Sequence, residues 1–136
     1  MGRGYWLVKQ EPTKYTFDDL IRDGRTMWEG VRNFQARNNL AAMRRGDAVL
    51  FYRSVEDPAV VGTCEVVRES YPDPTADDPR WVAVDLAAKR KLAHPVTLTA
   101  IKAEPALRDI PLVRQGRLSV MPLARAAFER IVELGG

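Results

Sequence analysis

MWEGVRNFQARNN, residues 27–39, begins with the pattern of a turn and continues with the pattern of a helix. Asn33 stands where the N-cap of a helix would stand, directly ahead of helix-forming residues. Gly46 occupies a C-cap position further along the chain. We therefore predict a helix over residues 34–46 with Phe34 in the core. The apolar residues at helical spacing are Phe34, Leu40, Ala41 and Met43.

The same stretch gathers side chains that suit a nucleobase. Flat apolar rings stack on bases, while amides and arginines hydrogen-bond to base edges. Trp28 directly precedes a Glu-Gly turn, so its ring fits a core position and an exposed position in a cleft equally well. Asn33 needs no ligand to explain it, because helix capping suffices. The residues alone are compatible with a base pocket and do not establish one.

Around this stretch, strand and helix patterns follow one another without regular alternation. Strand patterns cover residues 5–10, 47–54, 60–71, 80–91 and 117–121, with a short edge segment at 94–98. Helix patterns cover 16–24, 34–46 and 122–136, and part of 99–110. This organisation argues against a doubly wound parallel sheet and predicts an α+β domain. We expect five to six strands in a small, curved, mixed or antiparallel sheet or barrel, flanked by three to four helices.

Single residues mark several element boundaries. Thr16 is a suitable N-cap for the first helix, and Gly24 a suitable terminator. Gly62 indicates a bulge within its strand. Trp6 fits the core, and Pro122 fits the first turn of the last helix. The apolar stripe of that helix comprises Leu123, Ala127, Phe128, Ile131 and Leu134.

Length and composition limit the possible classes of protein. The chain has 136 residues, which is one domain spanning 1–136. Its net charge is +3 and its pI about 9.2, compatible with a polyanionic partner. Most of the cations are arginine, which suits bidentate contacts to phosphates and base edges. Genome composition is the alternative explanation for this richness in arginine.

Several functions are excluded or disfavoured by what the sequence lacks. With one cysteine, Cys64, and one histidine, His94, the chain offers no disulfide and no Cys/His metal site, so we expect neither metal nor cofactor. No nucleophile elbow, phosphate-binding loop or dinucleotide fingerprint occurs. Cys64 fits a small core residue, and His94 an ordinary exposed one. No apolar run is long enough to span a membrane, and we expect a cytoplasmic protein.

The sequence resembles the EVE domain family from about residue 4 to residue 136. The segments that carry the resemblance are YWLVKQEP, TFDDL, WEGVRNFQARNNL, GDAVLFYRS, VVGTCEVVRESYPDPTADDPRW, VDL, QGRLSVMPL and the closing ELGG. The string W-x-G-V-R-N-x-Q-A-R-N is long and unusual, as is G-R-L-S-V. The resemblance implies a PUA-like fold, a small β-barrel flanked by helices, related to the YTH and ASCH domains.

The resemblance also implies a non-enzymatic function: taking a modified base of DNA or RNA into an aromatic pocket, with modified cytosine in DNA expected first. By position, Trp28 forms the wall on which the base stacks. The other pocket residues implied are Lys9, Gln10, Glu11, Asn33, Tyr52, Ser54, Leu118 and Ser119. Phosphate contacts are expected from Arg32, Arg37, Arg44, Arg45 and Arg117, for which a solvated helix face is the alternative. We expect a monomer.

One departure and two alternatives accompany this hypothesis. Many family members have Lys-Ser-Glu-Pro where this chain has Lys9-Gln10-Glu11-Pro12, and a larger donor and acceptor at position 10 changes the preferred modification if its side chain faces the base. One alternative is an ASCH-like small hydrolase of modified nucleosides, with Lys9 as base and Glu11 as orienter. The other is a protein-interaction module.

Overall fold

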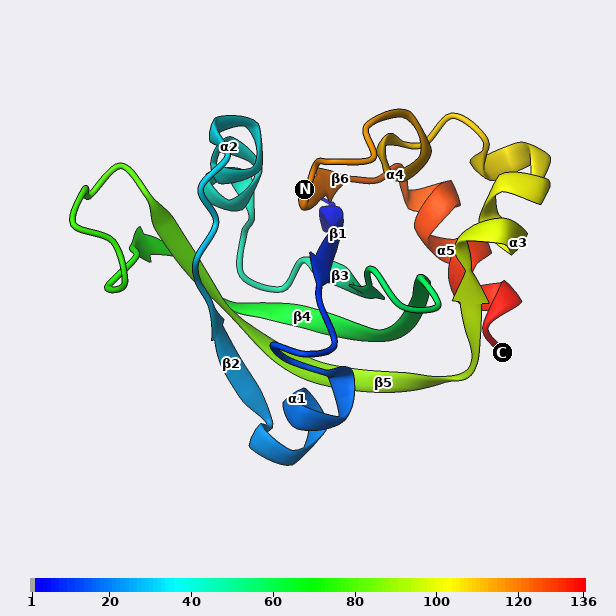
Figure 1. The fold of residues 1–136 in the computed structure, drawn as a ribbon, viewed down its shortest axis with the longest axis horizontal. Coiled ribbons are helices and arrows are strands. Elements are labelled where there is room, and N and C mark those ends of the chain that lie inside the picture. Colours follow the sequence, from blue (N-terminus) through cyan, green and yellow to red (C-terminus); the bar gives the residue numbers. More distant parts are fainter. Residues whose placement is uncertain (1) are drawn as a thin grey trace.

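The computed structural model describes residues 2–136, which form six β-strands, five α-helices and one 3-10 helix (Figure 1). The strands are β1 (Tyr5–Gln10), β2 (Arg25–Trp28), β3 (Ala48–Arg53), β4 (Ala59–Pro72), β5 (Val82–Thr97) and β6 (Val120–Pro122). The helices are α1 (Phe17–Asp23), α2 (Phe34–Ala42), α3 (Leu98–Ala103), the 3-10 helix η1 (Pro105–Leu107), α4 (Pro111–Arg114) and α5 (Arg125–Leu134). The predicted α+β class is confirmed, with one helix more than the upper expectation.

The strands form one mixed sheet with the order β2-β5-β4-β3-β1-β6. β1 and β3 run parallel, and the other neighbours run antiparallel. In residues 2–136 the end strands β2 and β6 do not pair, so the sheet is not closed and the expected barrel is wrong in this respect. Both end strands are short, with four and three residues, and neither offers a long edge for closure.

β4 and β5 form a long hairpin that sets the curvature of the sheet (Figure 1). The predicted separate segments 80–91 and 94–98 are one continuous strand. Pro95 is tolerated because β2 pairs only with the first part of β5, which leaves the Pro95 end without a second strand partner among residues 2–136. The register between β4 and β5 shifts at several points, and such bulges bend strands.

Gly62 lies at one of these irregularities, as predicted. It pairs with Phe51 of β3, next to a register shift. A Cβ atom built at Gly62 would lie 2.3 Å from the Phe17 ring. The glycine therefore allows α1 to lay Phe17 directly on the sheet, where its ring packs edge-on against Phe51 at 5.4 Å between centroids.

Two helices differ from the sequence predictions in their ends and faces. α2 ends at Ala42 rather than at residue 46, because Asp47 is buried and accepts the Arg44 amide, which folds the chain into a turn. Phe34 is 54% exposed, so its predicted core position is wrong. As the first residue of α2 it projects back beyond the helix and stacks on Trp81 at 4.9 Å. Pro122 belongs to β6, not to α5.

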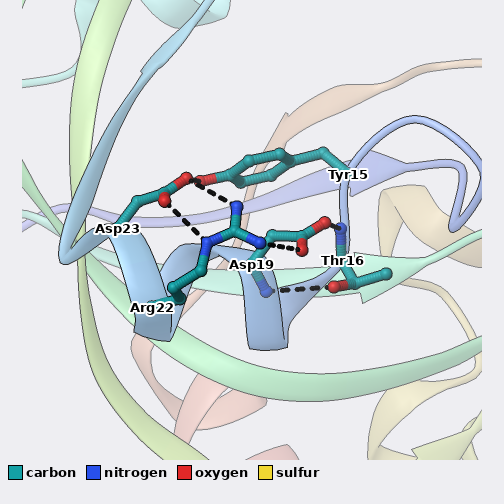
Figure 2. A network of polar contacts seen from close by, with 5 residues as sticks. All are labelled: Tyr15, Thr16, Asp19, Arg22 and Asp23. Carbon is teal, nitrogen blue, oxygen red and sulfur yellow. Dashed lines mark hydrogen bonds and ion pairs between the residues drawn. The ribbon is translucent and has the colours of Figure 1, made fainter.

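Other predicted boundaries are confirmed. Thr16 caps α1 through a capping box with Asp19 (Figure 2). Gly24 ends the helix at φ 79°. α5 buries Ala127 and Ile131 of the predicted stripe. None of the helices within residues 2–136 is both long and apolar enough to cross a bilayer.

Candidate functional site

A cavity of about 370 Å³ lies where the ends of β1 and β2 approach each other. These strands are not neighbours in the sheet, since three strands separate them. The cavity therefore occupies the open side of a curled sheet, and the 29–33 segment between β2 and α2 completes its wall. The predicted site residues that line it are Lys9, Gln10, Trp28, Arg32, Asn33 and Ser119. The cavity thus brings together residues that are far apart in the sequence.

The remaining predicted residues do not line the cavity. Leu118 is buried in the core. Tyr52 is buried behind Lys9, whose Nζ lies 5.8 Å from the centre of the Tyr52 ring. The Ser54 amide donates to the Gln10 carbonyl, so Ser54 supports the cavity wall from outside. The predicted phosphate-binding residues away from the cavity are Arg37, Arg44, Arg45 and Arg117.

Two polar side chains at the end of β1, those of Lys9 and Gln10, already have hydrogen-bond partners within the protein. The Lys9 ammonium donates to the Gly116 carbonyl at 2.8 Å, and partial burial lowers the Lys9 pKa. The Gln10 side-chain oxygen accepts the Glu11 amide at 3.0 Å. With its oxygen engaged, Gln10 retains its NH₂ group for a ligand, so it can act as a donor there. Glu11 pairs with Lys14 at 3.8 Å.

For Trp28 the sequence left open a core position and a position in a cleft, and the structure combines the two. Trp28 ends β2, pairs with Val84 of β5 and is 4% exposed. Its ring packs edge-on against Phe51, 5.6 Å between centroids. It is therefore a core residue that also forms part of the cavity wall. The four-residue strand that places it there was not predicted, because so short a stretch shows no clear alternation.

Asn33, like Trp28, has a structural role and also lines the cavity. Its side-chain oxygen accepts the Ala36 amide at 2.9 Å, which confirms the predicted N-cap of α2. The cap uses the oxygen, so the NH₂ group is the part of the side chain that can serve a ligand. Asn33 thus adds a possible hydrogen-bond donor to the cavity wall, beside the donors of Lys9 and Gln10.

Asp73 fixes the wall formed by residues 29–33, and the sequence patterns did not point to it. Its buried carboxylate accepts the Gly30 amide at 2.8 Å, the Arg32 guanidinium at 3.0 Å, and both the amide and the hydroxyl of Thr75. Burial alone would raise the Asp73 pKa, but these hydrogen bonds outweigh it and lower the pKa to about 2. Gly30 has φ 82°, a conformation that favours glycine.

Tyr15 lines the cavity, and the sequence patterns did not indicate it either. Its hydroxyl donates to Asp23 at 2.7 Å, and Arg22 binds the same carboxylate (Figure 2). Burial and the hydrogen bond to Asp23 raise the Tyr15 pKa. Figure 2 shows how this network ties the tyrosine to the end of α1. The separation of eight residues gave no sequence signal for this pairing.

The fold and the cavity together define a class: a small α+β domain with an open, curled, mixed sheet and a polar-lined cavity at its opening. The YTH domain of the Zygosaccharomyces rouxii MRB1 protein, in complex with N6-methyladenosine RNA, has a related fold, with a TM-score of 0.62 over 98% of this chain and 86% of that one. At 14% identity, this likeness concerns the fold alone.

The chain belongs to the EVE domain family, whose model matches residues 4–134. It is 34% identical to mouse thymocyte nuclear protein 1, over 96% of this chain and 73% of that protein. A protein from Agrobacterium tumefaciens of known structure is 42% identical, with a TM-score of 0.95 over 98% of this chain and 93% of that one. The human THYN1 protein, solved in complex with 5-methylcytosine-containing DNA, is 31% identical, with a TM-score of 0.89 over 97% of each chain.

Proposed function

We propose that this protein is a nucleic-acid-binding module that takes a modified base, first of all a modified cytosine of DNA, into the cavity and binds it without turnover. The observation that carries the proposal is the convergence of Lys9, Gln10 and Asn33 beside Trp28 at one cavity. Its volume lies at the lower end of the roughly 300–1,000 Å³ typical of ligand pockets, which suits one base. The complex of human THYN1 with 5-methylcytosine-containing DNA supports the same ligand class.

The cavity walls supply the two kinds of contact that a base requires. Trp28 offers an aromatic surface, although its low exposure limits the area available for stacking. The NH₂ groups of Asn33 and Gln10 are donors, and cytosine carries acceptors on its ring nitrogen and carbonyl. Lys9 and Lys14 add positive charge at the cavity, which attracts the phosphates that flank the base.

Selectivity for a methyl group should be modest. Burying one methyl group contributes about 0.8 kcal/mol, so the modification alone accounts for a preference of about tenfold or less. A base in a duplex must also leave its stack, at a cost of a few kcal/mol, so single-stranded DNA should bind more tightly than the same sequence in a duplex. RNA with the equivalent modification is the competing ligand.

The test uses Asn33→Ser, because serine keeps an N-cap acceptor for α2 while removing the amide. We expect the free energy of unfolding of Asn33→Ser to equal that of the wild type. We expect the variant to bind a short DNA single strand with a central 5-methylcytosine at least about fivefold more weakly, the loss typical of one hydrogen bond. Calorimetric titration against matched strands with cytosine or 5-methylcytosine measures the affinity and the preference.

Gln35→Ala is the matched control, since Gln35 is an exposed residue of the same helix that does not line the cavity. It should leave affinity and preference unchanged. Trp28→Ala is less suitable, because removing a buried tryptophan costs about 3–5 kcal/mol of stability. Equal affinities of the wild type for modified and plain strands, or full binding by Asn33→Ser, would contradict the proposal.

A further inference from the structure

An exposed cluster of aromatic rings and arginines lies beside the cavity and is not explained by the cavity itself. Phe34 is 54% exposed and stacks on the half-buried Trp81, with 27° between the ring planes. The Arg37 guanidinium lies 5.2 Å from the centre of the Phe34 ring, and that of Arg32 lies 5.8 Å from the Trp81 ring. We call these four residues the aromatic–arginine cluster.

The aromatic–arginine cluster is continuous with the cavity. Arg32 belongs to both, because it lines the cavity and also lies against Trp81. Asn33, which lines the cavity, directly precedes Phe34. The rings of the cluster therefore adjoin the cavity wall formed by Arg32 and Asn33.

The charges of the cluster favour a nucleic acid over an acidic protein surface or a purely apolar partner. Arg32 is paired with the buried Asp73. Arg37 bonds to the neutral side-chain oxygen of Asn38 and to the Arg80 carbonyl, and among the described residues it makes no ion pair. A guanidinium outside any ion pair of the described residues, next to an exposed ring, suits a base and its phosphate, since guanidinium groups and rings both stack on bases.

We propose that the aromatic–arginine cluster binds the nucleotide next to the base held in the cavity, its base stacking against Phe34 and Arg37. This inference rests on the proposed function for the position of the strand. The aromatic–arginine cluster differs from the cavity in what it recognises, because stacking accepts any base whereas the cavity selects a modified one. The cluster should therefore raise affinity without changing the preference for the modification.

The test compares three ligands: 5-methylcytidine alone, and five-nucleotide single strands with a central 5-methylcytosine or cytosine. The variants are Phe34→Leu, which keeps apolar packing on Trp81 without the ring face, and Phe34→Tyr, which keeps the ring. We expect Phe34→Leu to lower the affinity for both five-nucleotide single strands by about fivefold or more, the lower end of the range for base–aromatic stacking. Phe34→Tyr should bind them like the wild type.

Ile21→Ala is the control, as a comparably exposed apolar residue of α1 (47% against 54%). It should change nothing, and the affinity of all variants for the free nucleoside should equal that of the wild type. Wild-type affinity of Phe34→Leu for both strands would overturn the inference, as would equal losses for strands and nucleoside. A wild type without preference for the modified strand refutes the proposed function instead, and a loss of strand affinity in Phe34→Leu still supports the aromatic–arginine cluster.

Discussion

Replacing Asp73 by asparagine tests whether one buried carboxylate holds the cavity wall in place. Asp73 is 2% exposed and accepts four hydrogen bonds from Gly30, Arg32 and Thr75. An asparagine side chain at this position would keep the shape and one acceptor oxygen but lose the charge that favours Arg32. We expect Asp73→Asn to fold, with lower stability and a less firmly held segment between β2 and α2.

The magnitude follows from the Asp73 pKa. A fall from the ordinary value of 3.8 to about 2 corresponds to about 2.4 kcal/mol at neutral pH, because each tenfold change in proton affinity is about 1.4 kcal/mol. Solvent beside the loop screens part of this, and the remaining amide oxygen restores some bonding. We therefore expect a loss of about 1–2 kcal/mol.

The loss should depend on pH in a defined direction. The folded-state pKa lies below the unfolded-state value, so the stabilisation is complete above pH 3.8 and is lost as the pH falls through about 2. Urea unfolding followed by tryptophan fluorescence, at neutral pH and at several acidic values, measures the difference between Asp73→Asn and the wild type. That difference should shrink steadily below pH 3.8.

Asp78→Asn is the matched control, since the Asp78 carboxylate lies in the same loop and pairs with Arg80 of that loop rather than with the cavity wall. Its loss of stability should be clearly smaller than that of Asp73→Asn, because exposed ion pairs contribute little. A wild-type stability for Asp73→Asn at neutral pH would refute the role assigned to Asp73. So would a loss that stays constant down to the lowest pH.

Three further outcomes follow from the packing. Gly62→Ala should destabilise the protein by about 2–3 kcal/mol in urea unfolding, because the added Cβ would lie 2.3 Å from the Phe17 ring. Gly116→Ala, with open space around it, should leave the stability unchanged, and equal effects of the two substitutions would contradict the close packing at Gly62. Thr16→Ala removes the N-cap of α1 and should cost about 1 kcal/mol in the same assay; no change would mean that the cap does not stabilise the helix. Burial raises the pKa of the Cys64 thiol, so iodoacetamide should alkylate Cys64 only in unfolded protein; rapid labelling of the folded protein would contradict its burial.

The parts of the fold that were predictable are those with local causes. The helix from Thr16 to Gly24 could be predicted because its cap, its acidic first turn and its terminating glycine lie close together in the sequence. α5 could be predicted from the spacing of its apolar residues. Gly62 was recognised as irregular, but the Phe17 ring that requires the glycine comes from a distant helix.

The parts that were not predictable depend on contacts between distant segments. β2 has four residues and is a strand because it pairs with β5, about sixty residues later. α2 ends early because Asp47 binds the turn after it, although the apolar spacing continues. Phe34 fits that spacing as a core residue, but its place at the first turn directs it to Trp81 instead.

The cavity shows why fold and site were predictable to different degrees. A closed barrel would pair β2 with β6 and fill the space between them with backbone hydrogen bonds. Here the sheet curls without closing, and the side chains of Lys9, Trp28 and Asn33 line a cavity between the ends of β1 and β2. The family resemblance named these residues, yet only the geometry shows that two of the side-chain amides, those of Gln10 and Asn33, have their oxygens engaged and their NH₂ groups left for a ligand. A ligand that presents acceptors to this cavity is therefore favoured, because each of the two oxygens already accepts one hydrogen bond while neither NH₂ group has a partner among the described residues.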